Sequence, residues 1–390
     1  MSQLGAAIFL QIDTLVNHML TYEKVKWKAK KEAKRMKHIT KKIIVLSCAI
    51  SLLLGTLTGC AEDKKSEEKD NTQIISESTS ETTMSESMSE TTKADLDKVT
   101  IPHSYAGASE GIELRMANTD YFEKMTQNNL DYRVGKKGAT LDEFKTLAKE
   151  QGDDFTEEEI QGIDETLNRI EARFSEIGFG YPSDLEIVFV KNKMKDEYGA
   201  VAYTHQNQIY LEGDNLDFML GIPGLLDGTI AHELFHILSR NDPKFRQEMY
   251  NIFGFTIADE PEFSSEIRDI LGANPDVEVF DSYTMFNING EMTKGVVVTL
   301  LKNPYSEGAD LLSNYSTGIV PYDNPNIYYT IDEVSNFWDV FGENSNYVIA
   351  TEEGIADNFS SAVVYGMDGR KYKNPELIQN ILDVMENYEK

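Results

Sequence analysis

The chain has few cysteines, few positive charges and no long apolar segment. Its 390 residues include 2 Cys, which excludes a disulfide-stapled scaffold and a structural zinc site built on four cysteines. Lys and Arg total 37 against 66 Asp and Glu, for a net charge of −29. Because nucleic-acid binding needs clustered Lys and Arg, this charge argues against a nucleic-acid partner. The 41% of apolar residues and 10% of aromatic residues are enough for a folded core.

Residues 43–57 form a mainly apolar stretch. A membrane-spanning helix needs about 20 apolar residues, so this stretch is too short for one. A basic region precedes it, and Leu57-Thr58-Gly59-Cys60 ends it. This order resembles a bacterial lipoprotein signal. The resemblance implies a targeting region over residues 1–60 with its true start at Met36. It also implies a lipid anchor on Cys60 that holds the protein to the extracellular face of the cell membrane. The alternative is an ordinary N-terminal membrane anchor with an incidental Gly-Cys pair.

Residues 61–98 are rich in Ser, Thr and Glu and have almost no large apolar side chains. Such a segment cannot bury enough apolar surface to offset the entropy lost on ordering. We therefore predict a disordered tether between the lipid site and a folded region, residues 99–390.

The folded region mixes helical and strand patterns, which predicts an α+β protein. Residues 99–180 are predicted to be mainly helical, since a capping box at Thr156–Glu159 is followed by apolar residues at steps of three and four up to Gly178. Strands are predicted at 185–190, at 200–203 and 208–211 as a hairpin, and at 295–301 after an Asn-Gly turn. Further helices are predicted at 225–240, 331–341, 350–365 and 375–388.

One motif carries chemistry: His232-Glu-Leu-Phe-His236, an HExxH sequence. Side chains four residues apart share one face of a helix, so both imidazoles can reach a single Zn²⁺. Glu233 lies one step round the helix, where it can act as general base toward a water molecule. The alternative is an ordinary amphipathic helix with two half-buried histidines. Apolar flanks favour a buried helix, and burying His, Glu and His without a partner would be costly. We therefore predict one catalytic Zn²⁺.

In this context the motif resembles that of the zincin metallopeptidases. The resemblance implies a zincin-like fold, with a mixed sheet and an active-site helix, and the hydrolysis of peptide bonds. It also implies that an edge strand just before the helix pairs with an extended peptide substrate. Residues 208–211 would take that role.

The third zinc ligand has three candidates. The spacing of Glu353 and Asp357 resembles that in the second helix of the gluzincins. In that helix a ligand Glu is followed four residues later by an Asp that hydrogen-bonds a ligand His. Glu352 is the neighbouring alternative, but it has no acid four residues on. Asp242 stands at the metzincin spacing, although it also fits a turn that ends the helix. We favour Glu353 as the ligand, with a solvated acidic first turn of the helix as the alternative to any metal role.

The chain departs from the gluzincin pattern in its long stretch between the motif and Glu353. We predict an N-terminal lobe at 99–240, an insertion or second lobe at 241–345, and the third-ligand and C-terminal helices at 346–390. Asn274-Pro275-Asp276, within the insertion, fits a simple turn.

Peptide hydrolysis also needs a donor for the developing oxyanion. Tyr347 is the first candidate, followed by Tyr328, Tyr329 and His205. The expected function is that of a cell-surface zinc metallopeptidase acting on a peptide or protein. Two alternatives remain open: a metal-binding surface lipoprotein that recruits a partner, and a zinc amide hydrolase with a cell-wall substrate. The presence of Glu233 favours catalysis, because a binding module needs no general base. The oligomeric state is not predicted.

Overall fold

The computed structural model describes residues 98–388, which belong to one compact unit. The predictions about the targeting region 1–60, the start at Met36, the lipid site Cys60 and the tether 61–97 lie outside the described residues. Within residues 98–388, no helix is both long enough and apolar enough to cross a membrane.

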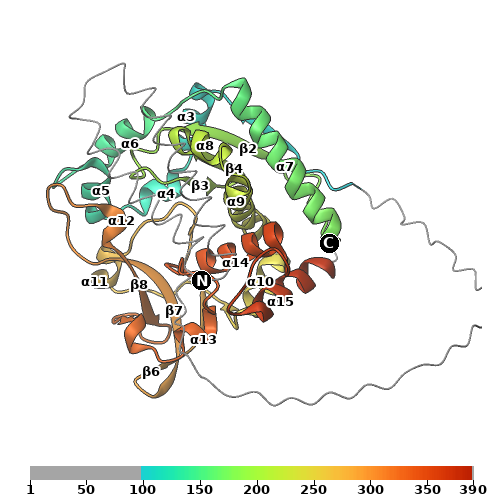
Figure 1. Ribbon diagram of the computed structural model, residues 1–390. Helices are drawn as coiled ribbons and strands as arrows, with labels where there is room; N and C mark the ends of the chain where they lie inside the picture. Colours follow the sequence, from blue (N-terminus) through green and yellow to red (C-terminus); the bar gives the residue numbers. More distant parts are fainter. Residues whose placement is uncertain (1–97, 389–390) are drawn as a thin grey trace, which may run out of the picture. The chain divides into compact units, whose positions relative to one another are not determined.

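The described residues form an α+β fold, as predicted (Figure 1). The helices are α3 (Ala108–Met116), α4 (Thr119–Glu123), α5 (Gln127–Val134), α6 (Leu141–Lys149), α7 (Glu157–Ile177), α8 (Gly213–Leu220), α9 (Leu225–Asn241), α10 (Pro243–Ile252), α11 (Ser265–Ile270), α12 (Leu311–Asn314), η1 (Ile331–Glu333), α13 (Phe337–Phe341), α14 (Thr351–Tyr365) and α15 (Pro375–Glu386). The strands are β1 (His103–Ala106), β2 (Ile187–Asn192), β3 (Ala202–His205), β4 (Gln208–Glu212), β5 (Thr256–Ile257), β6 (Ser282–Ile288), β7 (Glu291–Leu301), β8 (Tyr315–Pro321) and β9 (Tyr329–Thr330).

The first sheet is mixed, with the strand order β1-β2-β4-β3. Strands β1, β2 and β4 are parallel, and β3 returns antiparallel to β4 through the predicted hairpin. The expectation that residues 208–211 form the edge strand is wrong, because β4 pairs on both sides and β3 is the edge. Strand β1, within the region 99–180 that was predicted to be mainly helical, was not predicted. Four residues are too few to show an alternating pattern, and this strand depends on pairing with the distant β2.

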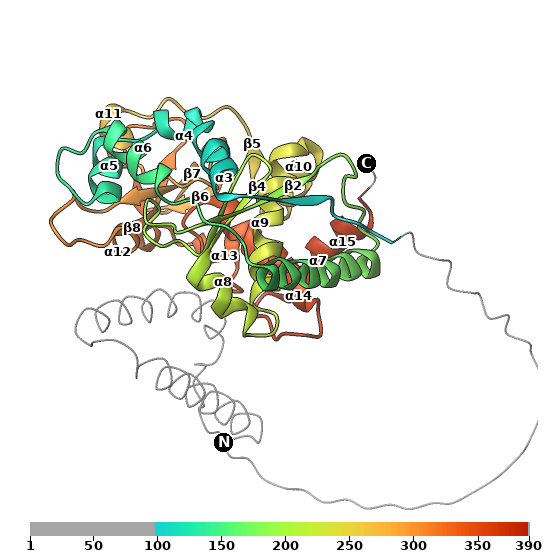
Figure 2. The same ribbon diagram turned by 90° about the horizontal axis from the view of Figure 1, so that it is seen from above.

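Helices cover both faces of this sheet (Figure 2). Phe189 of β2 packs into the main core with apolar residues of α7 and α9, while its neighbour Val190 faces the other side, where α3 lies. Helix α7 begins with the predicted capping box and ends at Gly178 in the left-handed conformation. These contacts fix the position of α9 against the sheet.

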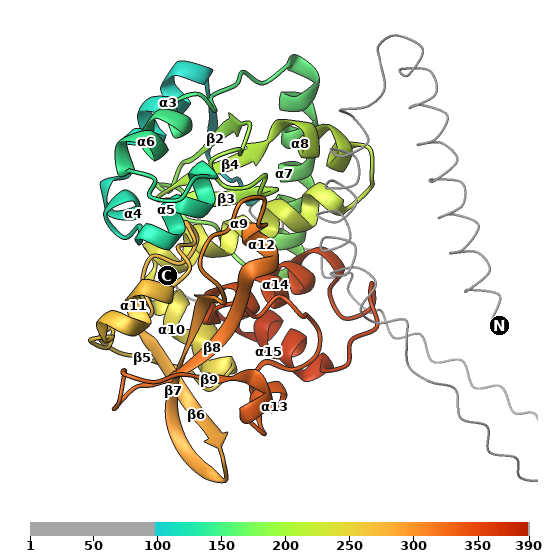
Figure 3. The same cartoon turned by 90° about the vertical axis from the view of Figure 1, so that its left-hand side faces the viewer.

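The residues between α9 and α14 form a second, antiparallel sheet with the order β5-β6-β7-β8-β9. The predicted Asn289-Gly290 turn joins β6 and β7, and both residues have positive φ. One face of this sheet, with Val297, joins the main core, and the other, with Val296 and Val298, forms a smaller core of its own. Helices α9 and α14 lie between the two sheets (Figures 1 and 3).

Helix α14 packs directly on α9, and this contact builds the site described below. Phe359 of α14 lies 5.4 Å, centroid to centroid, from Phe235 of α9. Ser360 donates a 2.7 Å hydrogen bond to the carbonyl oxygen of Gly228. Gly354 lets the first turn of α14 sit against the protein interior, because a Cβ at this position would lie 2.9 Å from the ring of Phe341.

Candidate metal centre

Three predicted ligands meet where α9 faces the first turn of α14. His232 Nε2 lies 3.1 Å from Glu353 Oε2, and His236 Nε2 lies 3.7 Å from the same oxygen. One donor atom from each of the three residues lies within 4.8 Å of the others. His236 is 0% exposed and Glu353 is 1% exposed. The alternative of a solvated acidic turn at the start of α14 is therefore wrong.

The other ring nitrogen of each histidine faces a carboxylate. His232 Nδ1 lies 3.2 Å from Asp357 Oδ1, the contact expected from the sequence. His236 Nδ1 lies 3.4 Å from Glu352 Oε1. A carboxylate on Nδ1 fixes the ring orientation and the tautomer, so that Nε2 is the nitrogen directed at the shared point. Glu352 was considered above only as an alternative ligand. It orients His236 in the same way that Asp357 orients His232.

Hydroxyl groups hold these two carboxylates in turn. Ser345 donates to Asp357, while Ser239 and Tyr250 both donate to Glu352. Ser239 lies on α9 itself and Tyr250 on α10. Each histidine is therefore oriented by a carboxylate, and hydroxyl groups hold that carboxylate in turn. This arrangement exists without a bound metal.

The site balances its charges internally. Burial would lower the pKa of His232, but the hydrogen bonds with Asp357 and Glu353 raise it well above its ordinary value. Burial would raise the pKa of Glu353, yet the hydrogen bond from His232 and the charge of His236 lower it. Because a histidine must be deprotonated to bind a metal, protons and a metal ion compete for this site.

Glu233 lies beside the three converging groups. It is 4% exposed, and its Oε2 has no hydrogen-bond partner in the part of the chain that the structure describes. Burial, together with the nearby carboxylate of Asp276, raises the pKa of Glu233 to about 8. A cation bound by the neighbouring histidines would lower the pKa of Glu233. Glu233 is thus a buried base close to, but separate from, the three donor atoms.

The residues fit a metal ion by their chemistry. Two imidazole nitrogens and one carboxylate oxygen form a donor set that suits Zn²⁺. His236 Nε2 and Glu233 Oε2 are buried and lack hydrogen-bond partners among residues 98–388, which is costly for polar atoms unless something else satisfies them. Two of the donors lie four residues apart on one helix, and the third comes from the helix packed against it.

The other candidates from the sequence are placed differently. Asp242 lies between α9 and α10, where its carboxylate caps α10 and accepts a 2.6 Å hydrogen bond from Tyr388. It is not among the residues that meet at the histidines. Tyr329 belongs to β9 at the edge of the second sheet, next to the exposed Tyr328. His205 is buried on β3, and burial with the charge of Arg240 lowers its pKa to about 3.

Tyr347 is the donor candidate that lies at the site. Its ring centroid is 6.1 Å from that of His232. Burial and the charges of Glu353 and Asp276 raise the pKa of Tyr347 well above its ordinary value. The phenol therefore keeps its proton and can donate a hydrogen bond.

Two further residues at this site were not predicted, and both lie in the segment interpreted as a simple turn. Asn274 donates a hydrogen bond to Glu353. Asp276 has a carboxylate oxygen within 4.8 Å of donor atoms of Glu233 and His236. Neither residue belongs to a motif, and only the folding of the chain between α9 and α14 brings them to α9.

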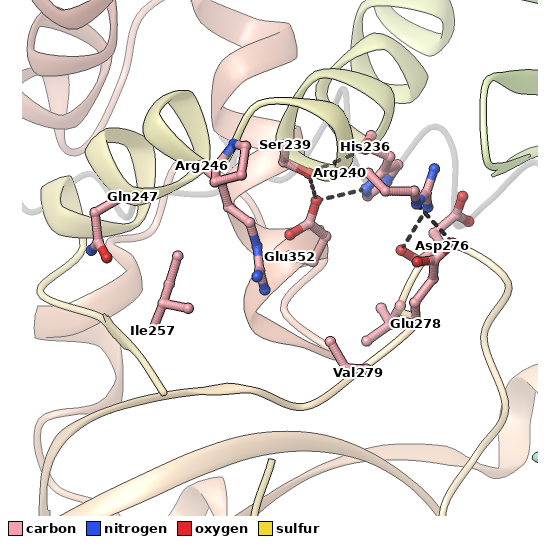
Figure 4. A pocket seen from close by; sticks show the side chains of 12 residues that line it. His236, Ser239, Arg240, Arg246, Gln247, Ile257, Asp276, Glu278, Val279 and Glu352 are labelled. Atoms are coloured by element: carbon pink, nitrogen blue, oxygen red, sulfur yellow. Dashed lines mark hydrogen bonds and ion pairs between the residues drawn. The ribbon is translucent and has the colours of Figure 1, made fainter. Parts of the chain in front are cut away.

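A pocket of about 320 Å³ adjoins the site on the side of His236. Figure 4 shows Asp276, Glu278 and Val279 on a segment that faces α9, with Arg240 reaching toward it. The space beside the donor atoms is therefore bounded by α9 on one side and by the segment that carries Asp276, Glu278 and Val279 on the other.

Comparisons with protein-family models, with curated proteins and with solved structures found no match to this chain.

Proposed function

We propose that this chain is a zinc-dependent metallopeptidase of zincin-like fold that hydrolyses peptide bonds. One observation carries the proposal: the Nε2 atoms of His232 and His236 converge on Glu353 while carboxylates hold both Nδ1 atoms. Glu233 lies beside them, with its Oε2 lacking a hydrogen-bond partner among residues 98–388. A structural zinc site would need no such base. The proposal places the protein on the extracellular face of the cell membrane through Cys60.

Zn²⁺, when bound by His232, His236 and Glu353, would supply a Lewis acid that polarises a carbonyl and lowers the pKa of water toward about 7. Glu233 accepts the proton of the attacking water and delivers it to the departing amine. Its position suits this role, since the buried Glu233 has a carboxylate oxygen within 4.8 Å of a donor atom of His236, close enough to exchange a proton with a water between them. Tyr347 donates a hydrogen bond to the oxygen on which negative charge develops.

The edge strand β3 offers a place for an extended peptide. Strand β3 pairs with β4 on one side only. The backbone N–H of Thr204 points away from β4, toward the insertion. Peptides commonly bind such an edge by adding a strand to the sheet.

The test uses the purified full chain in detergent. We expect about one zinc ion per chain, cleavage of a mixed-sequence peptide library, loss of cleavage after treatment with a chelator, and recovery on adding Zn²⁺. A protein that binds zinc but cleaves no peptide would contradict the proposal. Release of new amines from cell-wall fragments, with the peptides left intact, would favour the amide-hydrolase alternative. Inactivity on both substrates would favour the binding-module alternative.

The carboxylate behind His232 gives a separate prediction. Replacing Asp357 with Ala removes the acceptor that orients the imidazole, so we expect zinc affinity to fall about 10-fold to 100-fold. Competition with a chromogenic chelator measures this. The control is Asp339→Ala, which removes an exposed carboxylate from α13. Equal zinc affinity in the two variants would show that Asp357 does not support the metal site.

A further inference from the structure

The segment Asn274–Glu278 crosses the region where a peptide substrate would have to lie. It leads from α11 toward β6 and contacts both the edge strand β3 and helix α9. Figure 4 shows Asp276 and Glu278 of this segment opposite Arg240 of α9. Its contacts are made on three sides: with β3, with the metal-binding residues, and with Arg240 of α9.

On the first side, this segment occupies the free edge of β3. Asp276 Oδ1 accepts a 2.5 Å hydrogen bond from the backbone N–H of Thr204 and a 2.9 Å hydrogen bond from its hydroxyl. This N–H is the one directed away from β4, so an incoming peptide strand would need it. The Asp276 carboxylate therefore takes the place of a substrate carbonyl oxygen.

The same segment also reaches the residues of the candidate metal centre. A carboxylate oxygen of Asp276 lies within 4.8 Å of donor atoms of Glu233 and His236. Asn274 donates its amide hydrogen to Glu353. The segment thus contacts the edge strand and stands next to the general base at once, as the reactive part of a bound peptide would.

Ion pairs and hydrogen bonds hold the segment in this position. Arg240 Nε lies 2.9 Å from Glu278 Oε1, and its Nη2 donates a 3.5 Å hydrogen bond to the carbonyl oxygen of Asp276. Immediately upstream, Ala273 is bound by α5: its N–H donates to Asn129 at 2.9 Å, and its carbonyl accepts from Arg133 at 2.6 Å.

We propose that Asn274–Glu278 is an internal occupant of the peptide site, which keeps the enzyme latent until an extended peptide or another event displaces it. This inference rests on the proposed peptidase function. A segment of the same chain competes at an effective concentration in the millimolar range, so a micromolar peptide displaces it poorly. Activity is then scaled down by the fraction of molecules with the segment released.

The test compares the full-length wild type with Asp276→Ala, Glu278→Gln and the control Asp269→Ala, an exposed carboxylate on α11. We expect kcat/KM for the peptide library to rise at least about 10-fold in Asp276→Ala, which corresponds to a wild-type open fraction below one tenth. Glu278→Gln, which weakens the link to Arg240 and keeps the Asp276 carboxylate, should give a smaller rise. Asp269→Ala should match the wild type.

Hydrogen exchange of the peptide that contains Thr204 supplies a readout independent of turnover. Exchange there should be faster in Asp276→Ala than in the wild type or in Asp269→Ala. Equal exchange in all three would overturn the inference, and so would a kcat/KM that is unchanged or lower in Asp276→Ala while the wild type cleaves peptides. Either result leaves the peptidase function standing. If zinc is bound and no variant cleaves any peptide, the proposed function falls and the inference falls with it.

Discussion

Replacing Glu233 with Gln should abolish most of the peptide cleavage while the protein keeps its zinc. The amide has nearly the same shape as the carboxylate but cannot accept a proton at neutral pH, so the proposed general base is lost. A positioned general base typically contributes about 10²-fold to 10⁴-fold to the rate, and we expect a decrease in kcat/KM of that order. Zinc content should stay at the wild-type level, because Glu233 does not belong to the group formed by His232, His236 and Glu353.

Two measurements on the same preparations decide this prediction: zinc per chain, and kcat/KM for the best peptide of the library. Glu262→Gln is a suitable control, since it makes the same chemical change at an exposed residue. Should Glu233→Gln cleave within a few-fold of the wild-type rate, Glu233 would not be the base. A variant that loses its zinc would instead assign Glu233 a role in metal binding.

Replacing Glu353 with Ala should remove bound zinc together with activity. Its Oε2 is the atom that both Nε2 atoms approach, and its loss leaves two of the three converging donors. Loss of a residue that only orients a metal ligand typically lowers metal affinity about 10-fold to 100-fold. We expect a larger decrease in zinc affinity here, because Glu353 is itself a proposed ligand. Asp357→Ala therefore provides the comparison, and chelator competition measures both variants on one scale.

Asp242→Ala tests the other third-ligand candidate. Asp242 caps α10 and accepts a hydrogen bond from Tyr388, so its removal should cost about 1 kcal/mol of stability and no zinc. The assignment of Glu353 would fail if the Glu353 variant kept full zinc affinity while the Asp242 variant lost it. Thermal unfolding of both variants separates loss of metal from loss of fold.

Local patterns predicted those parts of the site that lie within single helices. The four-residue spacing of the two histidines, and of Glu353 and Asp357, places each pair on one helical face whatever the rest of the chain does. The capping box at Thr156 and the turn at Asn289-Gly290 are similarly local, and both are present in the structure. Each of these signals depends on residues that are near neighbours in the chain.

Features that depend on distant pairing were mispredicted or missed. Residues 208–211 have the pattern of any short apolar strand, and only the pairing of β4 with both β2 and β3 makes β3 the edge. Glu352 differs from Glu353 by one position, and the packing of α14 on α9 decides which carboxylate faces Nε2 and which faces Nδ1. Asn274-Pro275-Asp276 fits an ordinary turn, and only the fold of the chain between α9 and α14 brings Asp276 close to Glu233 and His236 of α9.

The sequence by itself determined the residues of the candidate metal centre: one helix that carries two histidines and a glutamate, and a second helix with an acidic pair at the matching spacing. Helical periodicity is enough for this, because it acts over four residues. The tertiary structure alone decided how these parts are used. It set the strand that forms the edge, the carboxylate that supports each histidine, and the placement of Asp276 beside Glu233. These relations join residues tens of positions apart, and only the packing of the two sheets around α9 and α14 creates them.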